Sequence, residues 1–209
     1  MIKGKKMELF KQVVTDILTT LYQPFWFTVS LTTAISFVYL YSYHPIDSGK
    51  GLKAALKAWI GELKQSSHFR RLILLIFYTV MIMNRTLYYR GVWLNPLQDV
   101  MGGWWIWKTS HATGEVSLSS ECFANILLMM PFVFLLLLTF RDKLLHNIKF
   151  GRVAWFGVKV GFLFSLGIET AQLFLRLGTF QFSDLAYNTL GGLLGGIIYW
   201  IGWKTKHSR

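Results

Sequence analysis

Charged and amide side chains stand inside the two most C-terminal apolar segments of this sequence. Glu169 and Gln172 lie in the first of these segments, and Asp184 and Asn188 lie in the second. An ionisable side chain at the centre of a membrane helix costs about 2.5–3.5 kcal/mol on insertion scales, so it marks a functional site by default. Two carboxylates at this depth can act as acid and base, or can build a binding site with the neighbouring amides.

The spacing of these polar residues places them on shared helix faces. Four residues of the first segment are separated by four, three and four positions, and they are Ser165, Glu169, Gln172 and Arg176. Residues three or four apart lie on one side of a helix. Asp184 and Asn188 stand one turn apart in the next segment, and Glu121 and Asn125 stand one turn apart in an earlier one.

The composition indicates a membrane protein. The chain has 209 residues, of which 53% are hydrophobic, 17% aromatic and 15% charged, and the mean hydropathy is +0.41. This length fits one helical bundle better than several domains. The net charge of +12 indicates Lys and Arg facing anionic lipid, because no nucleic-acid-binding motif is present. We expect membrane lipids as partners and no nucleic acid.

Five apolar segments have about the 20 residues that a helix needs to cross a bilayer. They cover residues 24–43, 72–90, 122–140, 153–175 and 185–203. The predicted fold is therefore all-α, a polytopic transmembrane helical bundle of about five spans. We divide it into an N-terminal segment with the first span (1–71), a four-helix membrane domain (72–203) and a cytoplasmic tail (204–209).

Residues 51–63 predict a basic amphipathic helix between the first two spans. Its apolar residues recur at helical spacing, with lysines elsewhere around the helix; they are Leu52, Leu56, Trp59, Ile60 and Leu63. Such a helix is expected to lie in the membrane interface.

Loop charges predict the orientation of the bundle, since Lys and Arg favour the cytoplasmic side. The connections 44–71 and 141–152 and the tail 204–209 hold six, four and three Lys or Arg residues, whereas 91–121 and 176–183 hold one each. The basic loops and the C-terminus are therefore expected in the cytoplasm, and the other two connections outside. With five spans the basic N-terminus lies outside, against the charge rule. The alternative is that residues 9–43 do not form one simple crossing and that residues 9–22 lie in the membrane interface before Pro24.

This orientation brings the polar residues of four spans together in the outer half of the bilayer. We predict one outward-facing ligand-binding site, whose principal residues are Arg85, Asn125, Glu169, Gln172, Asp184 and Asn188. Secondary candidates are Asn84, Arg90, Glu121, Ser165 and Arg176. Each amide alone can equally serve as a hydrogen bond between helices. Cys122 is the single cysteine and His111 has no partner at a diagnostic spacing, so no metal and no cofactor is predicted.

Glycine and proline in the later spans predict how the helices pack. Gly191 with Gly195, and Gly192 with Gly196, form two overlapping small-xxx-small motifs that let another helix approach closely. Pro131 should kink its helix or free a backbone carbonyl. The tryptophans of the 91–121 connection suit the outer membrane interface, and the alternative is that they line a site for an amphiphile; they are Trp93, Trp104, Trp105 and Trp107.

The same residues resemble the VanZ-like family of bacterial membrane proteins, whose founding member is linked to teicoplanin resistance. The matching elements are Arg85-Thr86 with Arg90, Asn95-Pro96-Leu97, Asn125 with Pro131, Glu169-x-x-Gln172, and Asp184-x-x-x-Asn188-x-x-Gly191. The resemblance covers residues 72–203. The Gly-Arg pair that the family usually carries between the Gln and the Asp reads Gly178-Thr179 here, and Arg176 is the residue proposed to replace that arginine. The aromatic residue that usually follows the Pro of the second element is also replaced, by Leu97.

The resemblance implies a bacterial cell-membrane protein that reduces susceptibility to lipoglycopeptide antibiotics, and it implies no reaction. Three hypotheses are compatible with it. The polar site binds an outer-leaflet amphiphile, either a lipid-tailed glycopeptide or a lipid-linked cell-wall precursor. Alternatively, the chain is an intramembrane enzyme that modifies such a precursor, with Glu169 and Asp184 as acid and base. In the third, the cluster only fixes helix register in a scaffold.

Overall fold

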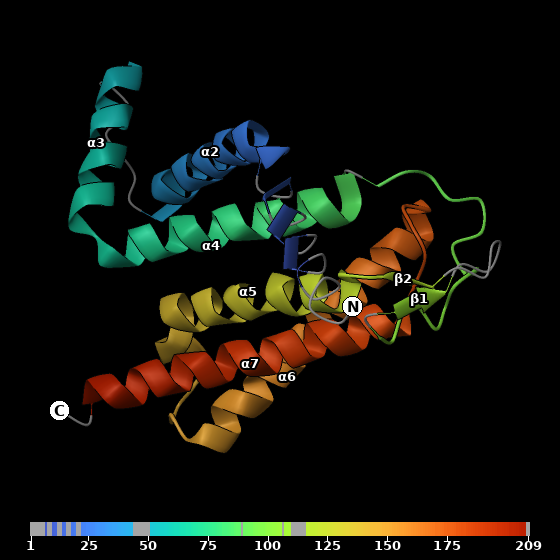
Figure 1. The fold of residues 1–209 in the computed structure, drawn as a ribbon. Coiled ribbons are helices and arrows are strands. Elements are labelled where there is room, and N and C mark those ends of the chain that lie inside the picture. Colours follow the sequence, from blue (N-terminus) through green and yellow to red (C-terminus); the bar gives the residue numbers. More distant parts are fainter. Residues whose placement is uncertain are drawn as a thin grey trace.

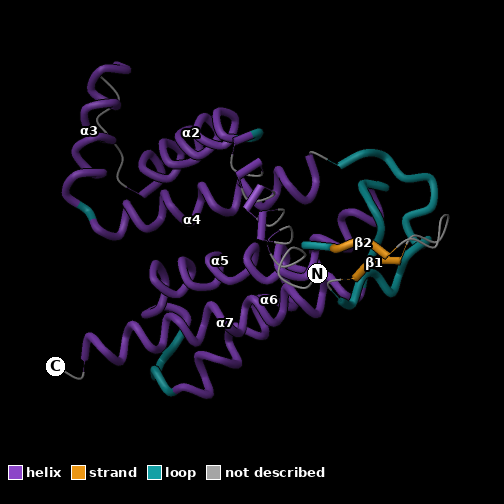
Figure 2. The backbone as a smooth tube through the Cα atoms, viewed as in Figure 1, coloured by secondary structure: helices purple, strands orange, loops and turns teal. Residues whose placement is uncertain are grey.

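The computed structural model shows a bundle of long helices with a loop region at one end (Figure 1, Figure 2). It describes residues 22–43, 51–88, 90–105, 107–109 and 116–207 and positions 7, 10, 11, 14, 15, 18 and 19, with the backbone alone at 107–109 and 116–118. The helices in this part are α2 (Phe25–Tyr43), α3 (Gly51–Gln65), α4 (Ser67–Met83), α5 (Glu121–Leu144), α6 (Phe150–Leu175) and α7 (Phe182–His207). Helix α4 continues into a π-helical turn, η2 (Asn84–Tyr88).

The predicted all-α class is confirmed, with one small addition. Two three-residue strands, β1 (Trp107–Thr109) and β2 (Val116–Leu118), pair antiparallel in the connection before α5. Within the described part of the chain, four helices are long and apolar enough to cross a membrane: Phe25–Tyr43, Ser67–Tyr88, Glu121–Leu144 and Phe150–Leu175. Helix α7 is as long as α6, at 26 residues, but it is not among the four. The count of five spans therefore stays a prediction.

Helix α7 packs along both α5 and α6 through its glycines (Figure 1). The two small-xxx-small motifs face different neighbours: Gly191 and Gly195 lie against α5, and Gly192 and Gly196 lie against α6. A Cβ atom on Gly191 would lie 2.4 Å from the carbonyl oxygen of Ile126, and one on Gly192 would lie 2.4 Å from that of Gly157. Backbone therefore meets backbone on both sides of α7, and no larger residue fits there.

Pro131 frees a carbonyl in α5, as the sequence predicts. Proline has no N–H to bond the carbonyl four residues earlier, which here belongs to Leu127. The hydroxyl of Tyr78 in α4 lies 3.1 Å from the carbonyl oxygens of both Leu127 and Leu128 and donates to them. The irregular backbone of α5 lies elsewhere, at Phe140, which has φ −121° and ψ 15°.

Helices α2 and α3 attach to the bundle through a stripe of small polar residues on α2. Thr28, Thr32 and Ser36 are buried at four-residue spacing. Thr28 Oγ1 accepts a hydrogen bond from Asn84 Nδ2 at 3.1 Å, and Ser36 Oγ accepts one from Trp59 Nε1 of α3 at 2.8 Å. One end of the stripe is thus held by η2 and the other end by α3.

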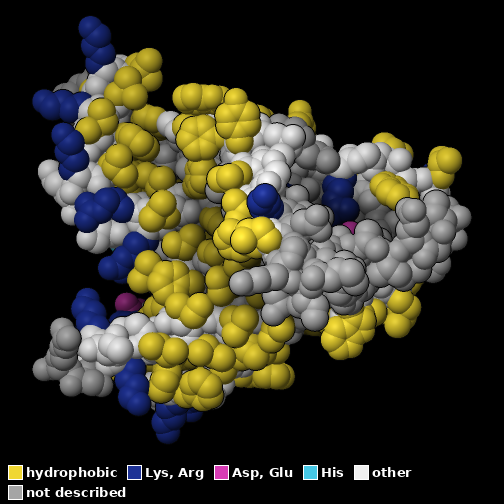
Figure 3. Space-filling model, viewed as in Figure 1, with side chains coloured by type: hydrophobic (Ala, Val, Ile, Leu, Met, Phe, Trp, Pro, Cys, Tyr) yellow, Lys and Arg dark blue, Asp and Glu magenta, His cyan; other side chains and the backbone are white. Residues whose placement is uncertain are grey.

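The predicted amphipathic helix forms as α3, whose lysines and apolar side chains occupy different sides (Figure 3). Leu52, Leu56 and Ile60 keep their side chains exposed, which suits contact with lipid. Its place in the membrane interface stays a prediction.

The two ends of the bundle differ in charge. Lys and Arg side chains gather at the end where α3 and the last turn of α7 lie, and apolar side chains cover the middle (Figure 3). The loop 90–105 and the strand pair occupy the opposite end (Figure 1). The same separation of Lys and Arg between the loops is the basis on which the sequence predicts the orientation of the bundle in the membrane. Lys3, Lys5 and Lys6 lie outside the described residues, so the side of the N-terminus stays a prediction. His111 also lies outside the described residues.

We predict that Gly192→Ala lowers the free energy of unfolding by about 1–3 kcal/mol, because the added methyl group meets the backbone of α6. Gly167→Ala is the matched control. Nothing lies within 4 Å of its Cβ position, so the better helix propensity of Ala should raise stability by up to about 1 kcal/mol. Thermal unfolding in detergent measures both variants. Equal effects would contradict the close packing of α7 against α6.

Orientation can be tested by cysteine labelling in a Cys122→Ser background. A membrane-impermeant maleimide should label Lys108→Cys in intact cells, and should label Lys149→Cys only after the membrane is permeabilised. This expectation rests on the basic connection around Lys149. The reverse pattern would place the polar end of the bundle in the cytoplasm and remove the case for an outer-leaflet ligand.

Candidate functional site

The principal residues predicted from the sequence lie around one cavity at the loop-bearing end of the bundle, which we call the outer cavity. It has a volume of about 680 Å³. Four elements contribute these residues to its wall: Arg85 from η2, Asn125 from α5, Glu169 and Gln172 from α6, and Asp184 and Asn188 from α7. Helix faces and loop charges thus sufficed to predict that these six residues converge.

Glu169 is held at the start of α7. Its side chain is 2% exposed, and Oε2 accepts a hydrogen bond from the backbone N–H of Gln181 at 2.9 Å. A carboxylate is favourable at the N-terminus of a helix, where backbone N–H groups lack partners. The side-chain Nε2 of Gln181 donates to Thr179 Oγ1 at 3.0 Å and to Asp99 Oδ2 at 3.2 Å. The short α6–α7 turn is therefore fastened to the polar centre of the site.

Two side chains of α7 connect this helix with its two neighbours. Asn125 Nδ2 of α5 donates to Asp184 Oδ1 at 2.7 Å. One turn later, Asn188 Nδ2 donates to Ser165 Oγ of α6 at 2.9 Å. The polar face of α7 therefore bonds to both helices at the depth of the outer cavity.

The π-helical turn η2 is joined to α6 by Gln172. Carbonyl groups at the end of a helix lack intrahelical partners, and Gln172 Nε2 donates to one of them, Thr86 O, at 2.7 Å. Within the same turn, Arg85 faces the outer cavity whereas Asn84 faces α2. The turn therefore directs Arg85 and Asn84, which are neighbours in the chain, toward the outer cavity and toward α2 respectively.

Two buried amide oxygens in the cavity wall have no hydrogen-bond partner among the described residues. They are Gln172 Oε1 and Asn188 Oδ1. A buried acceptor without a partner costs about 1–3 kcal/mol, so a donor group of a ligand would be stabilised at this place. The nitrogen of each amide donates a hydrogen bond to another helix. This bond fixes the orientation of the amide, so its oxygen is the atom that remains available to a ligand.

The wall of the outer cavity carries more carboxylates than guanidinium groups. Four carboxylates, of Asp99, Glu121, Glu169 and Asp184, and two guanidinium groups, of Arg85 and Arg90, line it. Within the described part of the chain, no group of three His, Cys, Asp or Glu residues is arranged to hold a metal ion. The arrangement suits an organic ligand with several hydroxyl or amine groups and an anionic group for the arginines.

The loop 90–105 covers the end of α6 and the start of α7. Three backbone hydrogen bonds fix it: Trp93 N donates to Arg176 O at 2.8 Å, Phe180 N to Pro96 O at 2.9 Å, and Phe182 N to Val100 O at 2.9 Å. The loop adds three residues to the cavity wall, Trp93, Gln98 and Asp99. Trp93 was considered for such a site from the sequence, but Gln98 and Asp99 were not. The element Asn95-Pro96-Leu97 signals this turn, because Asn95 Oδ1 accepts from Leu97 N at 3.3 Å, but it does not indicate what the turn covers.

The secondary candidates divide into residues that reach the outer cavity and residues that do not. Arg90 and Glu121 line it. Ser165 contacts it only through Asn188, and Asn84 bonds to α2 instead. Three further lining residues were missed because nothing in their spacing marks them: Thr86, Thr179 and Gln181.

Arg176, which we proposed as the replacement for the missing arginine, is not among the residues that line the outer cavity. It ends α6 in the left-handed conformation, with φ 55°, and is exposed, so its role stays a prediction. Arg90 takes the position beside Gly178, where a Cβ atom would lie 3.3 Å from Arg90 Nη1. Gly178 has φ +117°, so glycine is required there by its backbone conformation.

Comparison with known families assigns the chain to a family of membrane proteins. The sequence profile of the VanZ/LLP1 family matches residues 27–203. The match bears out the resemblance seen from residue 72 onward, and it also takes in nearly all of α2 and the whole of α3. No curated protein and no solved structure gives a significant match to the chain.

The bond between Asn125 and Asp184 can be tested by a double-mutant cycle. We predict that Asn125→Ala and Asp184→Ala show a coupling energy of about 1 kcal/mol in unfolding experiments in detergent. The control cycle pairs Asn125→Ala with Thr189→Ala, because Thr189 Oγ1 donates only within its own helix, to Leu185 O. That cycle should show a coupling near zero. Similar coupling in both cycles would contradict the specific contact.

Proposed function

The chain belongs to the VanZ/LLP1 family, and we propose that it reduces susceptibility to lipoglycopeptide antibiotics of the teicoplanin type by binding an outer-leaflet amphiphile in the outer cavity. The family assignment and four apolar helices of spanning length identify a VanZ-like, multi-pass membrane protein. The proposal adds the ligand and the phenotype. It rests on the link between the founding VanZ-like protein and teicoplanin resistance.

One observation carries the proposal: polar residues from four elements of an apolar bundle line a single cavity at its less basic end. Helix register alone would be served by isolated pairs of hydrogen bonds between helices. Here two buried amide oxygens have no described partner, and six charged side chains line the same space. Such an arrangement is more costly than a scaffold requires, which favours a ligand.

The chemistry of the wall indicates which part of an amphiphile would bind. Arg85 and Arg90 suit a carboxylate or a phosphate, which guanidinium groups bind through two parallel hydrogen bonds. The carboxylates and the amide oxygens of Gln172 and Asn188 suit hydroxyl and amine groups. About 680 Å³ has the size of a small-molecule site. The expected ligand is thus the polar headgroup of a lipid-tailed glycopeptide or of a lipid-linked cell-wall precursor.

The proposal is tested by removing charge from the outer cavity without changing side-chain size. In a teicoplanin-susceptible bacterium that expresses the chain, Glu169→Gln and Asp184→Asn should each abolish the resistance at normal abundance in the membrane. Glu62→Gln is the matched control, since Glu62 lies in α3 and does not line the cavity. It should leave resistance unchanged. Susceptibility testing and immunoblots of membrane fractions measure the two quantities.

The other outcomes of this experiment separate the hypotheses. Unchanged resistance in both cavity variants would refute the proposal. Loss of abundance in both would indicate that the cluster serves as a scaffold. Carboxylates of two helices in one cavity also permit acid–base chemistry; a changed profile of lipid-linked precursors in cells with the unaltered chain, absent with Glu169→Gln, would identify an enzyme.

A further inference from the structure

A second cavity, also of about 680 Å³, lies at the opposite, basic end of the bundle, and we call it the inner cavity. It is enclosed by the beginning of α4, the end of α5 and the end of α7. It shares no residue with the outer cavity, so a role for it is independent of the function proposed for that site. The charge distribution predicts that this end faces the cytoplasm.

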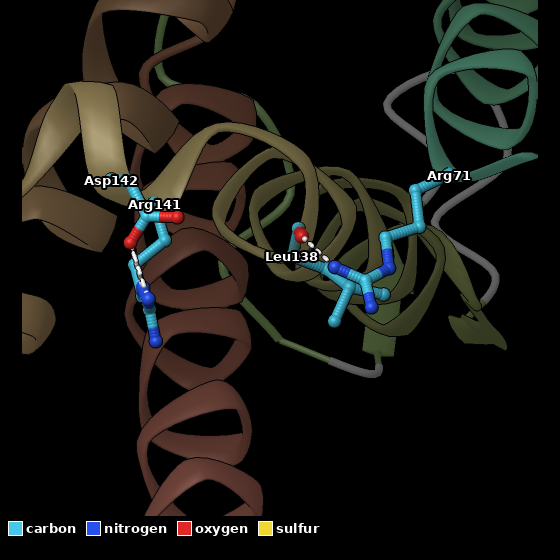
Figure 4. Close-up of polar contacts among 4 residues, drawn as sticks. All are labelled: Arg71, Leu138, Arg141 and Asp142. Atoms are coloured by element: carbon cyan, nitrogen blue, oxygen red, sulfur yellow. Dashed lines mark hydrogen bonds and ion pairs between the residues drawn. The ribbon is translucent and has the colours of Figure 1, made fainter. Parts of the chain in front are cut away.

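The rim of the inner cavity is cationic. Arg71, Arg141 and Lys206 line it, together with one carboxylate, of Asp142. Arg141 pairs with Asp142, its neighbour in the chain (Figure 4). The side chain of Asp142 is 82% exposed, so this pair is weak in water. Positive charge therefore remains in excess at the rim.

The side chain of Arg71 is held by a backbone carbonyl group and not by a carboxylate. Figure 4 shows its side chain reaching from α4 to α5, where Nη1 donates to the carbonyl oxygen of Leu138 at 3.2 Å. Among the described residues, no Asp or Glu forms an ion pair with Arg71. A guanidinium group has five N–H donors, and one bond to a carbonyl leaves several of them for an anion.

The less exposed residues of the inner cavity are mostly apolar, and one of them carries an unused donor. Phe134, Leu138 and Tyr199 line the cavity, and the hydroxyl of Tyr199 contacts the side chain of Arg141. Tyr199 is 6% exposed and lies about 12 Å along α7 from His207. Trp203 also lines the cavity, and its indole N–H is buried without a hydrogen-bond partner among the described residues. An indole N–H can only donate, so an oxygen atom of a ligand would satisfy it.

A cationic rim beside less exposed, mostly apolar residues, at the end of a membrane bundle, matches the two parts of a phospholipid. We propose that the inner cavity is a second binding site, which takes the phosphate-bearing headgroup of an anionic phospholipid. Arg71 and Arg141 bind the phosphate oxygens, Trp203 donates to a further headgroup oxygen, and an acyl chain lies along Phe134 and Leu138. Basic pockets between helix ends on the cytoplasmic side bind anionic lipids in this way.

The site can be tested by native mass spectrometry of the full chain in detergent, with phosphatidylglycerol as the anionic probe and phosphatidylcholine as the neutral one. The unaltered chain should retain phosphatidylglycerol in preference to phosphatidylcholine. Arg71→Gln with Arg141→Gln should weaken phosphatidylglycerol binding about tenfold. The matched control, Lys149→Gln with Arg152→Gln, removes two charges at the same end but outside the cavity. It should change binding less than about twofold.

Three results would overturn the proposal. Unchanged binding in the Arg71 and Arg141 variant refutes the site, and equal weakening in both double variants reduces it to attraction by surface charge. Displacement of phosphatidylglycerol by excess inorganic phosphate would assign the cavity to free phosphate instead of a lipid; we expect the lipid to stay bound.

A milder variant keeps the proposal testable if the arginine variant fails to fold. Trp203→Phe removes the indole N–H but keeps a ring that can stack on His207, which now lies 4.6 Å from the indole between ring centroids. It should weaken phosphatidylglycerol binding about threefold and should reduce the rise in melting temperature that the lipid causes. Unchanged affinity in this variant would count against the site.

Discussion

The close approach of α7 to both α5 and α6 is the constraint on which the rest of the structure depends. Lipid provides little hydrophobic driving force between helices, so packing and hydrogen bonds must hold them. Glycines on two sides of α7 remove the side chains that would separate the backbones. The polar residues one to two turns earlier then lie within hydrogen-bonding distance of both neighbours, as Asp184 does with Asn125 and Asn188 with Ser165. The outer cavity exists because these three helices converge.

A second regularity concerns backbone carbonyls, which the hydrocarbon core cannot solvate. Where a helix is interrupted or ends, a side chain from another helix supplies the missing donor. Tyr78 does so for the carbonyl that Pro131 frees, and Gln172 for Thr86 at the end of η2. These bonds turn two irregular points of the bundle into connections between helices.

The two cavities of the bundle differ in charge. The outer one carries more carboxylates than guanidinium groups and two buried amide oxygens, whereas the inner one has a cationic rim and less exposed residues that are mostly apolar. Lys and Arg concentrate at the end of the bundle where the inner cavity lies, and the positive-inside rule predicts that such an end faces the cytoplasm. The wall at the other end is acidic, which suits donors such as hydroxyl and amine groups.

The sequence by itself determined the helices, the faces on which polar residues lie and the end of the bundle where they meet, because helical periodicity and loop charge are local signals. It also determined the family. Only the tertiary structure decided how the loop 90–105 covers the site, since its hydrogen bonds join residues far apart in the chain, such as Phe180 and Pro96. It also decided which arginine lies beside Gly178. A left-handed residue at 176 and a π-helical turn at Asn84–Tyr88 redirect side chains in ways that regular helical spacing does not predict.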